Sequence, residues 1–164
     1  NKKNNFNYIF HATENSKNYL MQFIKKDDLK NVHIISNEQL KIATIKNSIF
    51  AIVKSGTVSL EVCKYGIPSI IIYKMNYLNF IIAKLFLKIK FANMINIINN
   101  KEIIPELLQN ECNSDEIYRS VNYLLKKPDL INTQLKQVNK TIDELKSTTS
   151  SSSEASNVLL SYLR

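Results

Sequence analysis

Residues 49–73 read IFAIVKSGTVSLEVCKYGIPSIIIY, and this stretch decides the fold class. It begins with an apolar run, 49–53, and ends with a second one, 69–73. Continuous apolar runs of this length are typical of strands that are buried on both faces of a parallel sheet. The residues between them, 57–65, have the pattern of a short helix, and Gly66 stands where glycine commonly ends one. The stretch therefore predicts a strand, a helix and a second strand of an α/β sheet.

The chain before this stretch repeats the alternation of strand and helix. Apolar runs predict strands over residues 8–12 and 32–35, and apolar residues at helical spacing predict helices over 17–26 and 38–47. Strands that alternate with helices in this way favour parallel neighbours joined by right-handed crossovers. We therefore expect a Rossmann-like parallel sheet flanked by helices, incomplete at its N-terminus, over residues 1–127.

The last third of the chain is predicted to be helical. Ser114 is expected to cap a helix over 115–127, and a longer polar helix should follow over 129–146. Residues 128–164 would then form a set of C-terminal helices. The apolar stripes expected to be buried are Ile117, Val121, Leu124 and Leu125 in the first helix, and Leu130, Leu135, Val138, Ile142 and Leu145 in the second.

A run rich in serine and threonine, 147–153, allows two interpretations. Its low-complexity composition is that of a flexible linker. Ser151 and Glu154 nevertheless have the spacing of a capping box, which predicts a closing helix up to Leu163.

Composition limits the class of protein. The 164 residues suit one domain with a sizeable core, and 45% hydrophobic with 22% charged residues is ordinary for a globular chain. Cys63 and Cys112 match no metal-binding or redox spacing, so we expect reduced thiols. The net charge of +8 favours phosphates, nucleic acid or an anionic membrane as partners. The chain opens on a polar segment without Met, and we expect it to be a piece of a longer protein.

The polar turn between the first apolar run and the helix is the strongest candidate site. Ligands of doubly wound sheets bind beyond the carboxyl ends of the strands, and this turn lies at such an end. Gly56 lets a phosphate approach the backbone, while the Ser55 and Thr57 hydroxyls and the N–H groups of the new helix supply hydrogen-bond donors. Glu61 lies one helical turn beyond Thr57, where a carboxylate can accept hydrogen bonds from ribose hydroxyls. The alternative is that Ser55 or Thr57 only caps the helix.

Several segments together resemble the C-terminal domain of the lipid-A-disaccharide synthase family, from about residue 49 to the end of the chain. They are SGTVSLEVC at 55–63, GIP at 66–68, YKM at 73–75, FANMINII at 91–98, KE at 101–102 and ELLQNEC at 106–112. The resemblance implies a glycosyltransferase of the GT-B architecture, in which two Rossmann-like domains face a cleft and the C-terminal one holds UDP.

An enzyme of this family transfers 2,3-diacylglucosamine from UDP-2,3-diacylglucosamine to 2,3-diacylglucosamine 1-phosphate (lipid X), and so forms the β-1,6 disaccharide of lipid A. The family's N-terminal domain, with its acceptor site and general base, and a Gly-Ser-Arg stretch are missing from this chain. We therefore expect the chain to bind UDP weakly or not at all, to catalyse nothing alone and to hold no catalytic residue. The resemblance further implies a cytoplasmic protein, peripheral at the inner face of the inner membrane. It allows a homo-oligomer and implies no cofactor and no metal.

Residue by residue, the resemblance implies a binding site for the UDP group. The positions assigned to it are Ser55, Gly56 and Thr57 at the phosphates, Glu61 at the ribose, and Lys74 and Asn96 in two further loops. Two positions of this region depart from the family's pattern. Lys74 stands where many members have Arg, and Ile95 replaces the Pro that often precedes Asn96.

Two other functions remain as alternatives. Another UDP-sugar transferase, of the N-acetylglucosaminyl transferase type, would share the fold and the ribose-binding acid, but residues 73–75 and Asn96 favour the lipid A enzyme. A basic nucleic-acid-binding module is the alternative from a different class. The lysines of this chain are scattered along the sequence, and its aromatic residues do not alternate with them. We therefore expect no nucleic acid partner.

Two further features have a structural and a functional interpretation. Residues 79–90 form an apolar stretch with Lys84 and Lys88, too short and too charged to span a bilayer. It is expected to pack on the sheet or on a partner subunit, and the alternative is a basic amphipathic helix that docks on an anionic membrane. His11 ends the first strand, and an ordinary structural role is favoured over contact with a ligand.

Overall fold

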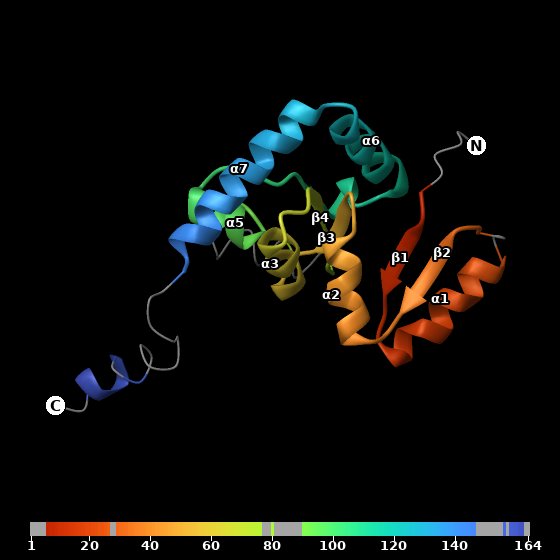
Figure 1. Ribbon diagram of the computed structural model, residues 1–164, viewed down its shortest axis with the longest axis horizontal. Helices are drawn as coiled ribbons and strands as arrows, with labels where there is room; N and C mark the ends of the chain where they lie inside the picture. Colours follow the sequence, from red (N-terminus) through yellow and green to blue (C-terminus); the bar gives the residue numbers. More distant parts are fainter. Residues whose placement is uncertain are drawn as a thin grey trace. The chain divides into compact units, whose positions relative to one another are not determined.

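The structure is a computed structural model that describes residues 6–26, 29–76, 80, 90–146, 156 and 158–162. Contacts between Cα atoms divide the chain into two units, Asn1–Ile49 and Phe50–Arg164, and each is described by itself (Figure 1). The boundary predicted after residue 127, between a nucleotide-binding domain and C-terminal helices, stays a prediction.

The first unit holds two parallel strands and two helices: β1 (Tyr8–His11), α1 (Glu14–Lys26), β2 (Val32–Ile35) and α2 (Glu38–Lys46). The strands and α2 lie where the sequence predicted them. α1 begins at Glu14 rather than at the predicted Lys17, because its first turn is polar and gives no apolar signal. That turn is closed by hydrogen bonds of 3.0 Å from the Ser16 hydroxyl and backbone N–H to the carbonyl of Thr13.

The second unit is built on a three-stranded sheet with the order β3-β4-β5, all parallel. Its elements are β3 (Ala51–Lys54), α3 (Thr57–Lys64), β4 (Ser69–Tyr73), α5 (Met94–Asn99), β5 (Glu106–Leu108), the 3-10 helix η1 (Gln109–Glu111), α6 (Ser114–Leu125) and α7 (Pro128–Glu144). The predicted fold class, parallel sheets flanked by helices, is confirmed. The sequence did not reveal β5 as a strand, since it has three residues and begins with a carboxylate.

An apolar cluster joins the sheet to α6. Ile70 of β4, Leu107 of β5 and Leu124 of α6 are buried, and partly buried side chains pack around them: Phe50, Ile72, Ile117, Val121 and Ile131. Burying a side chain of this size contributes roughly 1.5–3 kcal/mol. The stripe predicted for α6 is thereby confirmed at three of its positions, Ile117, Val121 and Leu124.

The predicted cap of α6 is wrong by one residue. The capping side chain is that of Asn113, whose Oδ1 accepts hydrogen bonds from the backbone N–H groups of Asp115 and Glu116 at 3.1 and 3.0 Å. Ser114 is therefore the first helical residue rather than the cap.

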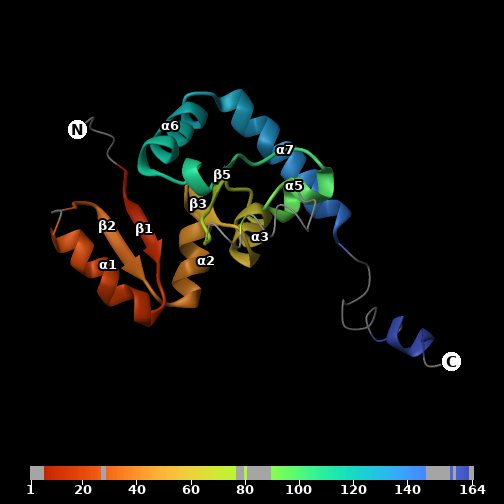
Figure 2. The ribbon, with the colours of Figure 1, turned by 180° about the vertical axis from the view of Figure 1, so that it is seen from behind.

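α7 packs on α3, α5 and α6 through a face that is partly polar, and its buried residues are Gln134, Val138 and Thr141. The Gln134 amide pairs with the backbone of Ser69 at the start of β4: Ser69 N donates to Oε1 and Nε2 donates to Ser69 O, both at 3.0 Å. Thr141 Oγ1 accepts a hydrogen bond of 2.8 Å from Asn99 Nδ2 of α5, which lies beside α7 in both views (Figures 1 and 2).

The apolar stripe predicted for α7 is accordingly wrong at its two ends. Leu130 and Leu145 are 39% and 50% exposed. The buried face is rotated away from them, because Gln134 and Thr141 have hydrogen-bond partners on β4 and α5 and can occupy it without a desolvation penalty.

Cys63 of α3 lies in the core, and burial raises the pKa of its thiol to about 11. Cys63 and Cys112 are both free thiols, as the sequence predicted. Burial therefore keeps Cys63 protonated and unreactive at neutral pH.

Two predicted segments lie largely or partly outside the described residues. The amphipathic stretch 79–90 is described only at Phe80 and Lys90, and the capping box proposed at Ser151 and Glu154 is not described. Residues 156 and 158–161 are helical, within the closing helix that was predicted. Among the helices described, none has the length and apolarity needed to cross a bilayer.

We predict that Gln134→Met lowers the free energy of unfolding by about 2–4 kcal/mol. The substitution keeps the volume of the side chain but leaves the Ser69 N–H and C=O buried without partners. Urea unfolding followed by circular dichroism measures the change. Asn139→Ala, which removes an exposed amide from the same helix, should change the stability by less than about 0.5 kcal/mol. A Gln134→Met chain as stable as the original would refute the structural role of this amide.

Candidate functional site

The turn that connects β3 to α3 lies at the carboxyl edge of the sheet. Gly56 takes φ +146° and ψ −164°, a backbone region that essentially only glycine reaches. A Cβ built on Gly56 would meet no atom of the described residues within 4 Å, so it is the backbone conformation that requires a glycine here. Gly66 has φ +67° immediately after the end of α3, as predicted for the residue that ends this helix. The space beside Gly56 is therefore open to a ligand.

The N-terminus of α3 differs from those of α2, α5 and α6. Asn37, Asn93 and Asn113 cap those three helices, and each side chain accepts hydrogen bonds from N–H groups of the first turn. The N-cap of α3 is Gly56, and no described side chain forms a capping hydrogen bond there. The first N–H groups of a helix have no partner within it, and together they attract anions. Among the described residues, the first turn of α3 therefore has N–H groups that no capping side chain occupies, and such groups can meet an anion at this edge of the sheet.

Thr57 and Glu61 follow the turn along one side of α3. Thr57 is exposed and is the first residue of the helix, and Glu61 is half-buried. Residues four apart on a helix project from the same side. The helix thus places a hydroxyl and a carboxylate on the side of α3 that begins at the turn.

Ser55 ties the turn to a distant segment of the chain. Its hydroxyl donates a hydrogen bond of 2.6 Å to the carbonyl of Ala92, 37 residues away. A hydroxyl has a single proton, so in this arrangement Ser55 retains only acceptor capacity toward a ligand. This contact adds a structural role to the phosphate-binding role that was predicted for Ser55.

Asn96 is fully buried in α5. Its Oδ1 accepts hydrogen bonds from Ile103 N and Ile104 N at 2.8 and 2.9 Å, and its Nδ2 donates to Ile104 O and to the Glu106 carboxylate, both at 2.7 Å. These bonds use both donors and both acceptor positions of the amide. In this conformation Asn96 shapes the loop that follows α5 and presents no surface to a ligand.

Two lysines stand at the carboxyl ends of β3 and β4. Lys54 precedes the turn, and its Nζ lies 5.4 Å from the centre of the Tyr73 ring. Lys74 follows β4 and is exposed. The next residue is held by Gln109, because Met75 N donates to Oε1 at 2.8 Å and Nε2 donates to Met75 O at 3.2 Å. Lys54 was not among the residues predicted from the sequence, although its position directly before the candidate turn is a signal that could have identified it.

A charged cluster in the first unit involves His11. Its Nε2 lies 3.7 Å from Oε2 of Glu38, whose Oε1 accepts a hydrogen bond of 2.5 Å from Lys41 Nζ. The hydrogen bond from Lys41, with the attraction of Lys41 and His11, holds the pKa of Glu38 below its usual value. Because α2 carries this acid from far along the chain, sequence proximity did not reveal it. The groups satisfy one another, which agrees with the structural role favoured for His11.

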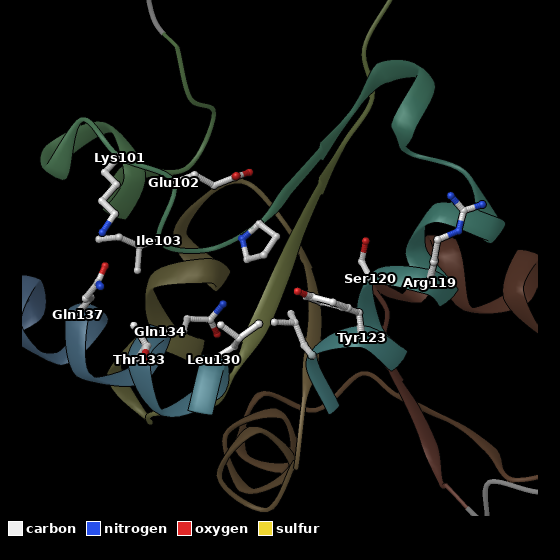
Figure 3. A pocket seen from close by; sticks show the side chains of 12 residues that line it. Lys101, Glu102, Ile103, Arg119, Ser120, Tyr123, Leu130, Thr133, Gln134 and Gln137 are labelled. Atoms are coloured by element: carbon white, nitrogen blue, oxygen red, sulfur yellow. The ribbon is translucent and has the colours of Figure 1, made fainter. Parts of the chain in front are cut away.

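A cavity of about 510 Å³ lies near the opposite edge of the second unit's sheet, between the segment 101–105, α6 and α7 (Figure 3). Pro105 leads into β5, and Gln134 is bonded to the first residue of β4, so the cavity borders the amino ends of these strands. Figure 3 shows side chains from all three segments around this space, among them Lys101, Tyr123 and Gln134.

Three of the polar side chains that line this cavity already have partners. Arg119 donates to Glu116 at 2.8 Å, the Tyr123 hydroxyl accepts from Lys127 Nζ at 3.0 Å, and the Gln134 amide is paired with backbone. Parallel α/β sheets bind ligands at the carboxyl ends of their strands. The carboxyl edge with the Gly56 turn is therefore the better candidate site.

Comparisons with known proteins point to one family. A family profile described as lipid-A-disaccharide synthetase matches residues 1–160. The lipid-A-disaccharide synthase of Rickettsia bellii (strain OSU 85-389) is 40% identical over 113 residues, which are 69% of this chain and 29% of that protein. The synthase of Rickettsia conorii is 41% identical over 99 residues, 60% of this chain and 22% of its own. The synthase of Persephonella marina is 33% identical over 126 residues, 75% of this chain and 33% of its own. The chain thus spans between 22% and 33% of the length of these relatives.

We predict that replacement by asparagine destabilises the chain more at position 56 than at position 66. Gly56→Asn should lower the free energy of unfolding by about 1–3 kcal/mol, because only glycine takes φ +146° without strain. Gly66→Asn should cost less than about 1 kcal/mol, since asparagine adopts the left-handed region at φ +67°. Urea unfolding of the two variants compares them directly, and equal losses would contradict the backbone geometry of the turn.

Proposed function

The chain belongs to the lipid-A-disaccharide synthetase family, and we propose that it forms the UDP-binding half of a GT-B glycosyltransferase. The observation that carries this proposal is the N-terminus of α3, which follows Gly56 without a capping side chain and has Glu61 one turn further along. Nucleotides bind doubly wound sheets in this way, with a phosphate at a helix N-terminus and an acidic side chain on the ribose.

Within the proposed site, each part of UDP has its own partners. The N–H groups of Gly56 and Thr57, with the Thr57 hydroxyl, bind the diphosphate. Glu61 accepts hydrogen bonds from the ribose hydroxyls. Lys74 adds positive charge at the carboxyl end of β4. Ser55 and Asn96 act through the loops that they hold in place, which is supported by their hydrogen bonds to the chain.

In the whole enzyme, the sugar donor is UDP-2,3-diacylglucosamine and the acceptor is lipid X, with the acceptor site and the general base on a further domain. The reaction joins the two sugars by a β-1,6 bond and releases UDP. Acylated substrates favour a position at the inner face of the inner membrane. The net charge of +8 suits an anionic lipid surface.

The ribose contact predicts a coupling between Glu61 and the 2′-hydroxyl of the nucleotide. Glu61→Ala should weaken UDP binding by about 1.5–3 kcal/mol, the range for hydrogen bonds to a charged group. It should weaken binding of 2′-deoxy-UDP clearly less, because one of the two ribose hydroxyls is already missing. Ligand-observed NMR titrations of this chain measure both affinities.

A matched control removes a carboxylate elsewhere. Glu144→Ala takes an exposed acid from the end of α7 and should leave both affinities unchanged. If Glu61→Ala lowers the two affinities equally, or lowers neither, the assignment of Glu61 to the ribose is wrong.

The substrate class is tested by activity. Joined to the N-terminal part of the Rickettsia bellii synthase, this chain should release UDP from UDP-2,3-diacylglucosamine in the presence of lipid X. UDP-N-acetylglucosamine should not replace that donor. The control is the same fusion with Glu61→Ala, whose rate should fall at least tenfold for a loss of about 1.4 kcal/mol or more. Equal turnover of both sugar donors would indicate the N-acetylglucosaminyl transferase type instead.

A further inference from the structure

We propose that Glu106, on β5, is a positioning residue for the UDP site. Its carboxylate holds the backbone of Ala92 and Asn93 against the turn around Gly56, and so sets where the diphosphate binds. This inference rests on the proposed function, since it concerns the same turn.

Glu106 is a buried carboxylate surrounded by hydrogen-bond donors. Its Oε2 accepts a hydrogen bond of 2.6 Å from Ala92 N, and its Oε1 accepts bonds from Asn93 N at 2.9 Å and from Asn96 Nδ2 at 2.7 Å. The residue is only 8% exposed. A buried charge is unfavourable unless hydrogen bonds compensate it, and these three donors come from a single segment, 92–96. The carboxylate thus fixes that segment to the sheet.

The segment held by Glu106 contacts the turn on both sides of Gly56. On one side, the Ala92 carbonyl accepts the 2.6 Å hydrogen bond from the Ser55 hydroxyl. On the other side, Asn93 Nδ2 donates to the Ser59 hydroxyl at 3.0 Å, and that hydroxyl donates to the Gly56 carbonyl at 2.6 Å. Two chains of hydrogen bonds therefore run from one carboxylate to the residues that flank the strained glycine.

The register of the sheet places Glu106 where this contact is possible. Ile71 of β4 pairs with Val53 of β3 on one side and with Glu106 on the other. Residues paired across parallel strands project from the same face, and Ile70 and Leu107 project from the opposite face toward α6. A carboxylate therefore stands beside the apolar side chains of Ile71 and Val53. An apolar side chain at this position would pack equally well on the sheet, but only an acid can accept the hydrogen bonds from the segment 92–96.

Replacement by glutamine breaks this arrangement at a defined atom. A glutamine keeps one acceptor oxygen and replaces the other by an NH₂ group. If the oxygen stays with Asn93 N and Asn96 Nδ2, the NH₂ group faces the Ala92 N–H, and two donors oppose each other. Ala92 is the residue whose carbonyl holds Ser55, so the change should be transmitted to the turn.

The test compares Glu106→Gln with the unchanged chain by NMR. Without ligand, the amide signals of Gly56 and Thr57 should shift and their hydrogens should exchange faster in the variant. With ligand, the affinity for UDP should fall roughly 5- to 20-fold, or about 1–1.8 kcal/mol, whereas the affinity for uridine, which lacks phosphates, should stay within about twofold. A residue that only stabilised the fold would affect UDP and uridine alike.

Glu102→Gln is the matched control. It removes a carboxylate four residues away, and its amide oxygen can still accept the 3.2 Å hydrogen bond from Glu106 N. This variant should leave the turn signals and both affinities unchanged. If Glu106→Gln does not fold, Ser59→Ala replaces it, because it cuts the link between Asn93 and Gly56 and should also weaken UDP more than uridine.

The outcomes separate the two proposals. If the unchanged chain binds UDP, and Glu106→Gln or its replacement Ser59→Ala binds UDP equally well, Glu106 has no positioning role while the proposed function stands. If neither the unchanged chain nor its fusion to the N-terminal part of the Rickettsia bellii synthase binds UDP, the proposed function and the role of Glu106 in it both fall. Selective loss of UDP affinity, with shifted Gly56 and Thr57 signals, supports the inference.

Discussion

Backbone N–H and C=O groups that lie beside short strands need partners, and in the second unit buried amide and carboxylate side chains supply them. Gln134 pairs with the backbone of Ser69 at the start of β4, and Gln109 pairs with that of Met75 just after its end. A glutamine offers one acceptor and two donors on a planar group, so it can replace a neighbouring strand at one residue. β4 is thereby fixed at both ends. The loops of the carboxyl edge extend from these fixed points.

Asparagine serves the same purpose at the helix ends. Asn37, Asn93 and Asn113 cap α2, α5 and α6. Asn31 and Asn100 take φ of 60° and 45°, the left-handed conformation that glycine usually occupies. The abundance of asparagine therefore has a structural use in this chain, whatever its compositional origin. It also explains how the fold manages with two glycines.

The parts of the fold that could be predicted are those whose signal is local. The unit β3-α3-β4 was predictable because two apolar runs, a turn with Gly56 and a helix end at Gly66 follow one another within residues 49–73. β5 was not predictable, since a three-residue strand that begins with Glu106 shows no apolar run. The buried face of α7 was misjudged for a related reason: Gln134 is core only because Ser69 lies opposite it, and sequence spacing does not reveal that partner.

In the candidate site, too, some features follow from local sequence and others depend on contacts between distant residues. Gly56, Thr57 and Glu61 were predictable from their spacing, whereas the contact of Ser55 with Ala92 joins residues 37 positions apart. The buried state of Asn96 depends on the backbone of Ile103 and Ile104, which only the folded chain brings to it. Resemblance to a family identifies such a residue without revealing whether it contacts the ligand or supports the loop.

The N-cap of α3, like that of α7, has no capping hydrogen bond from a described side chain, but only α3 begins at a glycine. An asparagine at position 56 could cap the helix, and a cap of this kind stabilises a helix by about 0.5–2 kcal/mol. The chain instead has Gly56 at φ +146°, a conformation that asparagine does not adopt, and leaves the helix N–H groups without a capping side chain. Backbone strain persists only where the surrounding structure over-determines it. The hydrogen bonds of Ser55, directly before Gly56, and of Ser59, whose hydroxyl donates to the Gly56 carbonyl, supply that constraint. The uncapped helix start and the hydrogen bonds that hold the strained glycine are the two features on which the proposed ligand site rests.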